Sequence, residues 1–162
     1  GIGTNLPGIN EVLEIGKGKV VKEGKKVAIL NFGARLQECK KAAEALSKKG
    51  IEITIIDARF AKPLDEKLII NVATNHEVVI SIEEGSVGGF GSHVMQLLSN
   101  RGIFDKGLKF RSMTLPDIFI DQDSPEKMYE KAGLDSESIV NKIEETLNSK
   151  IILVNSKNKN LV

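Results

Sequence analysis

The sequence predicts an α/β fold in which a parallel sheet is covered by helices on both faces, and three observations support this prediction. Short apolar segments of strand length alternate with longer segments whose apolar residues recur at helical spacing. Glycines, prolines and capping residues separate these segments. The chain has 162 residues, of which 41% are hydrophobic, and this suffices for one domain with a sizeable core. Strands that alternate with helices are typical of parallel sheets.

Four segments have the apolar content of buried strands. Residues 27–32 form a nearly uninterrupted apolar run between Gly24 and Gly33. The other three segments are residues 51–57, 78–82 and 108–115. Residues 19–21 are a shorter extended candidate at the end of a Gly- and Lys-rich stretch, which favours an edge strand there.

Helices are expected between these strands and after the last one. The first carries an apolar stripe over residues 36–46 and ends at Gly50, a C-capping residue. Asp65 is a good N-cap for the second helix, and the third follows a glycine-rich loop. Ser124-Pro125 predicts the start of a short fourth helix, and the last helix begins near Asp135.

We expect one domain at residues 27–149, preceded by a linker and edge strand at residues 1–26 and followed by a polar tail at residues 150–162. The chain begins at Gly1 without a methionine and without the basic and apolar regions of a signal peptide. We therefore expect it to be a piece of something longer or a processed product.

The composition argues against several classes of protein. The 23 lysines and arginines nearly balance the 22 aspartates and glutamates, so the strongly basic character typical of nucleic-acid-binding proteins is missing. No apolar run approaches the ~20 residues that cross a membrane. The single cysteine, Cys39, has no partner for an internal disulfide and is expected to be a small core residue. Neither a nucleic acid nor a membrane is expected as a partner.

The most unusual segment is residues 83–92, which join the third buried strand to the third helix. Its four glycines, Gly85, Gly88, Gly89 and Gly91, allow positive φ angles and close backbone approach. Their order matches neither the dinucleotide-binding fingerprint nor the P-loop. A loop shaped for contacts is favoured, and a small-anion site at the helix N-terminus stays open as the alternative.

Charged residues beside the strand ends complete the set of candidates. Adjacent residues at a strand end point to opposite sides, which argues against Glu83 and Glu84 acting as an acid–base pair. We expect Glu84 to cap the following helix, where it would repel a phosphate, and Phe90 to provide the apolar core of a contact surface. Asp57 and Arg59 flank another strand end and either grip an anionic substrate or pair across an interface.

Three strings of residues give the chain a family resemblance: residues 57–65 (Asp-Ala-Arg-Phe-Ala-Lys-Pro-Leu-Asp), residues 83–94 (from Glu-Glu-Gly to Ser-His-Val) and residues 115–120 (Leu-Pro-Asp-Ile-Phe-Ile). Together they resemble the C-terminal, transketolase-type domain of the 1-deoxy-D-xylulose-5-phosphate synthase family. The resemblance is collinear over roughly residues 1–147. It implies a three-layer fold whose mostly parallel, mixed sheet has about five strands, with residues 19–22 as an antiparallel edge strand.

The resemblance also implies a function for the longer protein. Enzymes of this family use thiamine diphosphate and Mg²⁺ to condense pyruvate with D-glyceraldehyde 3-phosphate, with loss of CO₂. The product, 1-deoxy-D-xylulose 5-phosphate, feeds isoprenoid, thiamine and pyridoxal biosynthesis. The family's Gly-Asp-Gly…Asn cofactor segment, its activating glutamate and its Tyr-Pro-Arg-Gly-Asn segment are not in this chain. The fragment alone is therefore expected to be catalytically inactive and to bind neither cofactor.

What the resemblance leaves for this chain is assembly. The expected partners are the remaining domains of the same polypeptide and a second subunit in a homodimer, in the cytoplasm of a bacterium or a plastid stroma-type compartment. No catalytic, cofactor-binding or metal-ligating residue is expected here. The interface candidates are Arg59, Glu83, Glu84, Gly85, Gly88, Gly89, Phe90 and Gly91.

Two other functions remain open from the sequence. The chain is alternatively the equivalent domain of another thiamine-diphosphate enzyme, such as a 2-oxo-acid dehydrogenase β subunit. Those subunits share a similar glycine-rich loop but generally lack the string at residues 57–65. The third possibility is a stand-alone binding module that uses the glycine-rich loop.

Overall fold

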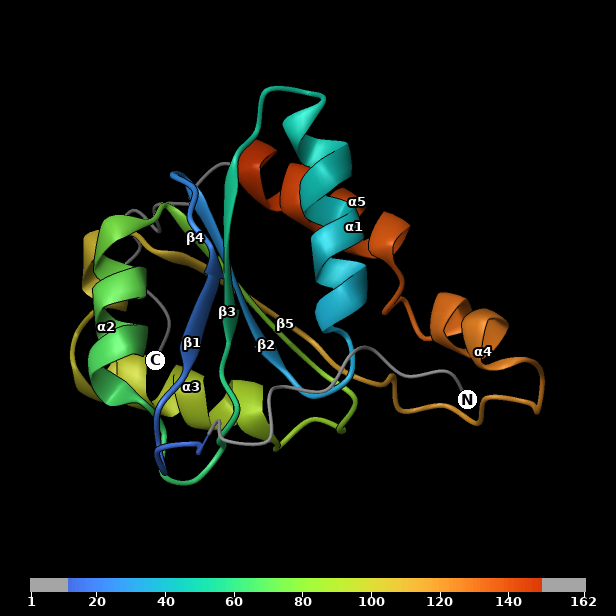
Figure 1. The fold of residues 1–162 in the computed structure, drawn as a ribbon, viewed down its shortest axis with the longest axis horizontal. Helices are drawn as coiled ribbons and strands as arrows, with labels where there is room; N and C mark the ends of the chain where they lie inside the picture. Colours follow the sequence, from blue (N-terminus) through green and yellow to red (C-terminus); the bar gives the residue numbers. More distant parts are fainter. Residues whose placement is uncertain (1–11, 150–162) are drawn as a thin grey trace, which may run out of the picture.

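The computed structural model describes residues 12–149, which form a five-stranded mixed sheet (Figure 1). Its strand order is β1-β3-β2-β4-β5. The strands are β1 (Lys19–Lys22), β2 (Val27–Phe32), β3 (Ile53–Asp57), β4 (Val78–Glu83) and β5 (Lys109–Met113). Only β1 runs antiparallel to its neighbour, with Lys19 opposite Asp57. The predicted mixed sheet and its antiparallel edge strand are confirmed.

Helices cover both faces of this sheet, as predicted (Figure 1). One face packs against α1 (Leu36–Ser47) and α5 (Ser136–Asn148), and the other against α2 (Glu66–Asn75) and α3 (Phe90–Asn100). A short 3₁₀ helix, Phe104–Lys106, precedes β5. The seven-residue α4 (Pro125–Lys131) stands apart from both layers at the right of the view.

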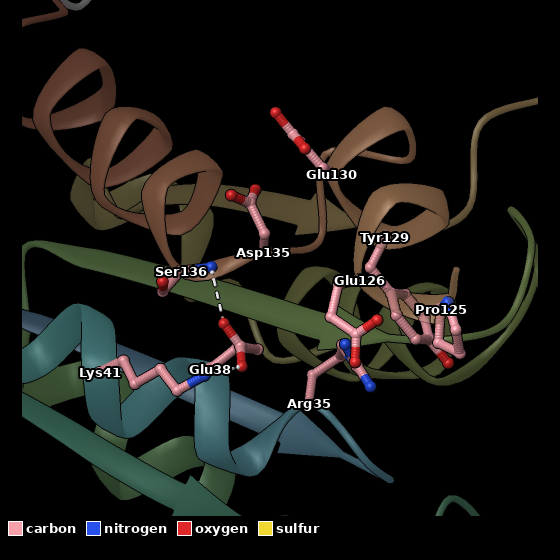
Figure 2. A pocket seen from close by; sticks show the side chains of 9 residues that line it. All are labelled: Arg35, Glu38, Lys41, Pro125, Glu126, Tyr129, Glu130, Asp135 and Ser136. Carbon is pink, nitrogen blue, oxygen red and sulfur yellow. Dashed lines mark hydrogen bonds and ion pairs between the residues drawn. The ribbon is translucent and has the colours of Figure 1, made fainter. Parts of the chain in front are cut away.

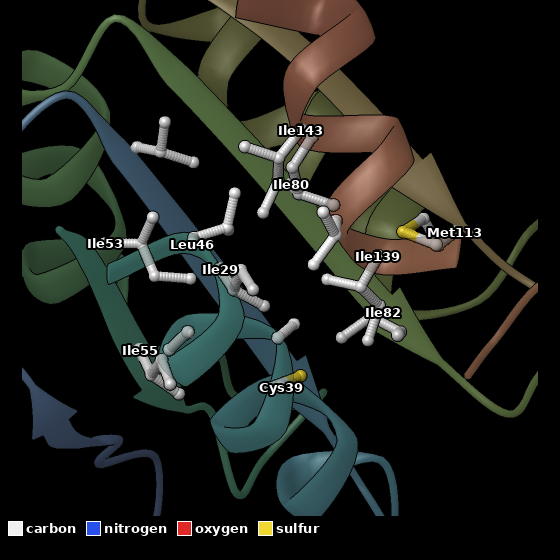
Figure 3. Packing of buried hydrophobic residues seen from close by; sticks show 14 of the residues in the cluster. Ile29, Cys39, Leu46, Ile53, Ile55, Ile80, Ile82, Met113, Ile139 and Ile143 are labelled. Carbon is white, nitrogen blue, oxygen red and sulfur yellow. The ribbon is translucent and has the colours of Figure 1, made fainter. Parts of the chain in front are cut away.

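The core has two halves because strands buried on both faces alternate between them. In β2, Val27 and Ile29 belong to the half under α1 and α5, and Ala28 and Leu30 to the half under α2 and α3. Figure 3 shows the first half, in which isoleucines of three strands surround Cys39 of α1. Cys39 is fully buried, as predicted, and desolvation raises its pKa to about 12.

The helix ends explain why the sequence signals were reliable. Gly50 has a φ of +78°, and the next amide, of Ile51, donates to the carbonyl of Leu46 at 3.0 Å, which closes α1. Asp65 accepts the amide of Leu68 at 3.1 Å at the start of α2. Strand ends were predicted less well, since β3 begins two residues later than expected, at Ile53.

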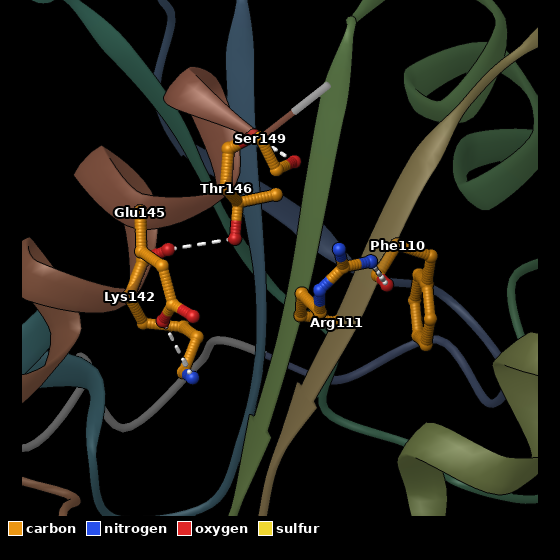
Figure 4. Close-up of polar contacts among 6 residues, drawn as sticks. All are labelled: Phe110, Arg111, Lys142, Glu145, Thr146 and Ser149. Carbon is orange, nitrogen blue, oxygen red and sulfur yellow. Dashed lines mark hydrogen bonds and ion pairs between the residues drawn. The ribbon is translucent and has the colours of Figure 1, made fainter. Parts of the chain in front are cut away.

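The far edge of the sheet is protected by charge. Lys109 of β5 forms an ion pair with Glu77 at 3.0 Å and donates to the carbonyl of Leu147 at 3.2 Å. Arg111 is exposed, and its guanidinium donates to the carbonyl of Phe110 at 2.8 Å (Figure 4). Cationic side chains on an edge strand discourage pairing with a further strand. Figure 4 also shows Thr146, near the end of α5, bonded to the carbonyl of Lys142.

Within residues 12–149, no helix is long and apolar enough to cross a membrane. The predicted polar tail at residues 150–162 and the first 11 residues of the predicted linker lie outside the described residues. The proposed division of the chain at residues 26 and 149 stays a prediction.

Candidate functional site: the carboxyl edge of the sheet

The loops that follow β2 and β4 leave the sheet at its topological switch point. The two strands are neighbours, yet β2 leads into α1 on one face and β4 leads into α3 on the other. Open α/β sheets bind ligands in the crevice outside the carboxyl ends of strands at such a point. The loop after β5 joins them, because the amide of Leu115 donates to the carbonyl of Gly85 at 2.9 Å.

Glu83 closes the N-terminus of α3 from inside the sheet. It is the last residue of β4, is only 4% exposed, and accepts the amides of Phe90 at 2.9 Å and Gly91 at 2.8 Å. The expectation that Glu84 caps this helix is therefore wrong. Side chains alternate along a strand, and Val79, Ser81 and Glu83 share the face on which α3 lies. One carboxylate does cap the helix, as predicted, but it is the neighbouring one.

The glycines of the loop make room for this carboxylate. A Cβ on Gly89 would lie 2.2 Å from Oε2 of Glu83, and one on Gly85 would lie 2.8 Å from the same atom. A Cβ on Gly91 would lie 2.6 Å from Oγ of Ser81. Real Cβ atoms do not approach other atoms so closely, so the backbone can follow this path only if these three positions are glycine. Gly88 is needed for its conformation instead, since its φ is +105°.

Glu84 points to the opposite side and joins a polar cluster with Arg35 and Tyr129. Its Oε1 lies 3.0 Å from Nε of Arg35, whose side chain is only 14% exposed. The guanidinium carbon of Arg35 lies 3.4 Å above the ring of Tyr129 on α4, a cation–π contact. A hydrogen bond with Glu84, and to a lesser degree desolvation, raises the pKa of Tyr129. The cluster ties α4 to the ends of β2 and β4.

Arg35 and Tyr129 were missed by the sequence reasoning. Arg35 follows the first buried strand at a switch point, which is a usable signal. Tyr129 carries no local signal, because only the packing of α4 brings it to Arg35.

A hollow of about 420 Å³ opens beside this cluster, between the starts of α1, α4 and α5 (Figure 2). Among its charged side chains, Glu38 interacts with Lys41 and with the backbone amide of Ser136. Partial burial by itself raises the pKa of Glu38, but the hydrogen bond and charge of Lys41 and the amide of Ser136 outweigh it, so the pKa lies below its ordinary value. The Ser136 amide donates to Glu38 at 3.1 Å. The residues that line the hollow are Arg35, Glu38, Lys41, Pro125, Glu126, Tyr129, Glu130, Asp135 and Ser136.

The structure separates the predicted interface residues into three groups. Glu83, Phe90 and Gly91 are buried, while Glu84, Gly85 and Gly89 are partly exposed and Gly88 is exposed. Phe90 is 1% exposed and its ring stacks on Phe32 with centroids 5.2 Å apart. The expectation that this ring provides a contact surface is therefore corrected: the first turn of α3 packs down on the sheet, and the ring belongs to the core. The interface role of the loop stays a prediction.

Arg59 lies at the end of β3, apart from this loop. Its φ of +60° places a non-glycine residue in the left-handed region, a conformation that persists only where the surroundings enforce it. Its Nε lies 3.6 Å from a carboxylate oxygen of Asp57. The two side chains therefore lie side by side at this strand end, and both predicted roles, gripping an anionic substrate and pairing across an interface, stay predictions.

The described residues do not fit a diphosphate or a metal ion at this edge. The first amides of a helix can bind an anion, but at the start of α3 the amides of Phe90 and Gly91 already donate to the Glu83 carboxylate. Among residues 12–149, no three His, Cys, Asp or Glu side chains gather as a metal site requires. The fold and the site thus define a three-layer α/β domain whose switch point is filled by its own side chains.

Residues 16–139 match the family described as "Transketolase, C-terminal domain". This match covers most of the chain, and the chain belongs to the transketolase C-terminal domain family. The predicted family-level fold is thereby confirmed.

Solved structures agree with this assignment. A structure titled "Split gene transketolase, inactive beta4 tetramer" is 28% identical with a TM-score of 0.78, over 88% of this chain and 46% of that one. Transketolase from Campylobacter jejuni is 18% identical, and a transketolase mutant from Pichia stipitis 13% identical; each has a TM-score of 0.58 over 80% of this chain and 18% of its own. These last two show the fold alone. The chain spans about half the length of the split-gene transketolase chain that it matches.

Proposed function

We propose that the chain is the C-terminal domain of a thiamine-diphosphate enzyme of the 1-deoxy-D-xylulose-5-phosphate synthase type. The observation that carries the proposal is the combination of the family match with the string at residues 57–65, which 2-oxo-acid dehydrogenase β subunits generally lack. In this proposal the longer enzyme condenses pyruvate with D-glyceraldehyde 3-phosphate, and this domain serves its assembly.

The geometry of the carboxyl edge supports an assembly role. Its charged groups are engaged with one another, as in the contacts of Glu83 with α3 and of Glu84 with Arg35. The tip of the glycine-rich loop is nevertheless presented outward, with Val87 82% exposed. A tip of this kind, on a loop whose base is fixed by a buried carboxylate, suits contact with the remaining domains or with a second subunit.

The reaction is tested with the polypeptide that includes the residues encoded ahead of Gly1. Purified with thiamine diphosphate and Mg²⁺, it should release CO₂ from pyruvate only when glyceraldehyde 3-phosphate is present and should form 1-deoxy-D-xylulose 5-phosphate, detected by mass spectrometry. Release of CO₂ from pyruvate without glyceraldehyde 3-phosphate, coupled to reduction of an added disulfide acceptor such as lipoamide and formation of its acetyl thioester, would favour the 2-oxo-acid dehydrogenase alternative.

A second candidate is a subunit of a split transketolase, which the 28% identity to such a protein favours. Transfer of a two-carbon unit from a ketose phosphate to an aldose phosphate, with no use of pyruvate, would support it and overturn the first proposal.

The cofactors are proposed to bind outside this domain. Isothermal calorimetry of the 162-residue chain with thiamine diphosphate and Mg²⁺ should show no saturable heat. Saturable binding with a Kd on the order of micromolar would instead make the glycine-rich loop a ligand site and support the stand-alone binding module.

A further inference from the structure

Exposed apolar side chains gather along one edge of the sheet. Within residues 12–149, eight large hydrophobic residues are exposed, and six of them lie on segments beyond the carboxyl ends of the parallel strands. Val20 on β1 and Met95 on α3 are the two exceptions. The six are Val12, Leu13, Ile15, Val87, Ile118 and Phe119. Scattered single apolar residues need no explanation, but a row along one edge marks an interaction surface.

The most prominent part of this row is the loop after β5. Phe119 is fully exposed and Ile118 is 65% exposed, so most of the surface of both side chains is left without a packing partner in the domain. Behind them lies a hollow of about 490 Å³, lined mainly by apolar side chains of the loop and of α4. Ile118 and Phe119 of the loop and Met128 and Tyr129 of α4 are among the residues that line it.

This loop is held in place at both of its ends. The Leu115 amide donates to the Gly85 carbonyl at 2.9 Å, and Tyr129 on α4 packs against Arg35, which in turn pairs with Glu84. An exposed aromatic ring on a fixed backbone loses little conformational entropy on binding, which is the property of an interface anchor.

The leading segment of the chain reaches the domain at the same edge. Lys19 pairs with Asp57, the last residue of β3, so residues 12–18 lie beyond the carboxyl end of that strand. The amide of Gly18 donates to the Asp65 carboxylate at 3.2 Å and anchors the segment there. Val12, Leu13 and Ile15 on this segment continue the apolar row. Any polypeptide that precedes the segment is therefore tethered beside the row at a high effective concentration.

We propose that Phe119, Ile118 and the hollow behind them bind an apolar surface on the preceding domain of the same polypeptide. The occupant rests on the proposed function, in which that domain exists, and on the tether just described. Phe119 is the anchor that enters the preceding domain, and the hollow beside α4 receives an apolar side chain from it. A second copy of this chain has no such tether and would have to find the surface by diffusion.

Thiol labelling tests this proposal, because the thiol of Cys39, the cysteine of this chain, is buried and is not expected to react. Cys39 is fully buried with a raised pKa, so in the 162-residue chain a maleimide reports only on an introduced cysteine; in the longer polypeptide the labelled peptide is identified by mass spectrometry. Phe119→Cys and the matched control Lys48→Cys, at an exposed position on the opposite edge, are each made in the 162-residue chain and in the longer polypeptide. Phe119 and Ile118 are both exposed, so replacing either does not disturb folding, and Ile118→Cys, which keeps the Phe119 ring, is labelled in parallel so that loss of the anchor is not mistaken for absence of the interface.

We expect the thiol introduced by Phe119→Cys to react at least about tenfold more slowly in the longer polypeptide than in the 162-residue chain, since a side chain in an interface core reacts only when the interface opens. The Lys48→Cys control should react at the same rate in both. Equal rates in the two proteins for both Phe119→Cys and Ile118→Cys would overturn the proposal. So would slow labelling in the 162-residue chain that depends on its concentration, because this would assign the surface to a second copy. The readout does not involve catalysis, so it separates this proposal from the assignment of the reaction.

Discussion

The two edges of the sheet are built on opposite chemistry. At the carboxyl edge, Glu83 is buried, glycines crowd around it, and apolar side chains project outward. At the amino edge the charges are exposed and paired across short distances, as in Lys22–Glu52 at 2.8 Å and Lys49–Glu144 at 2.5 Å. The first edge is shaped for contact with another protein surface, and the second is a surface for water.

Parallel topology explains part of this difference. Helices α1, α2, α3 and α5 begin at the carboxyl edge, where their first amides need acceptors. Carboxylates supply them for three of these helices: Asp65 for α2, Glu83 for α3 and Glu38 together with Asp135 for α5. Helices end at the other edge, where a glycine with positive φ such as Gly50 suffices. Substitutions at the carboxyl edge should therefore lower the free energy of unfolding more than matched substitutions at the amino edge.

The largest effect is expected when a methyl group is placed in the carboxylate cradle. Gly89→Ala should lower the free energy of unfolding by about 3 kcal/mol, because its Cβ would overlap the Glu83 carboxylate. The control at the other edge is Gly50→Ala, where no atom lies within 4 Å and only the φ of +78° is unfavourable, for a loss of about 1 kcal/mol. Urea unfolding measures both, and equal losses would mean that the cradle is not tight.

The next effect concerns the buried carboxylate itself. Glu83→Gln should cost about 2 kcal/mol, because a charged acceptor for two amides is replaced by a group that accepts at one atom and donates at the other. Glu145→Gln, which removes an exposed ion pair with Lys142, should cost under about 0.5 kcal/mol. A cost for Glu83→Gln as small as that of its control would remove the distinction between the edges.

A smaller effect is expected at the cluster that holds α4. Tyr129→Phe keeps the ring under Arg35 and removes the hydroxyl whose pKa Glu84 raises; because this tyrosine is partly exposed, the change should cost less than about 1 kcal/mol. The chain has one tyrosine, which makes its titration readable from ultraviolet absorbance. The pKa should lie above the ordinary value of about 10 and fall toward it in Glu84→Gln.

The sign of the pH dependence follows from this raised pKa. The protonated hydroxyl is favoured in the folded state, so its contribution to stability is present below the unfolded-state pKa and is lost as the pH rises through the folded-state pKa. A pKa of Tyr129 that does not respond to Glu84→Gln would contradict the hydrogen bond.

The smallest effect separates two carboxylates of lowered pKa, one at each edge. Glu38 bonds the Ser136 amide at the start of α5, whereas Glu52 is exposed, bonded to Lys22 and Ser47. Lowered pKa values mean that both contributions are present above the unfolded-state pKa and are lost as the pH falls through the folded-state value. Urea titrations at low and high salt measure how much each of Glu38→Gln and Glu52→Gln lowers the free energy of unfolding. High salt should diminish the loss caused by Glu52→Gln more than the loss caused by Glu38→Gln. The reverse order would argue against the helix-capping role of Glu38.

The sequence by itself determined the elements and their order. Nearly uninterrupted apolar runs predicted strands buried on both faces, as at residues 27–32, and Asp65 and Gly50 predicted helix ends, because these signals are local. Strand alternation could also have shown that Glu83, and not Glu84, caps α3. Glu83 lies an even number of residues from Val79, whose side chain faces α3, so the two side chains are on the same face of β4.

Tertiary structure decided the rest of the site. The burial of Phe90 depends on its stacking with Phe32 from another strand, and the meeting of Arg35 with Tyr129 depends on where α4 comes to lie. The exposure of Phe119 likewise depends on a loop held by Gly85 and α4. Contacts between residues far apart in the chain leave no periodic signal in it, because packing brings together residues whose local sequences are independent of one another. The sequence therefore specified which elements form, and packing decided which side chains meet at the carboxyl edge and which are left to face a partner.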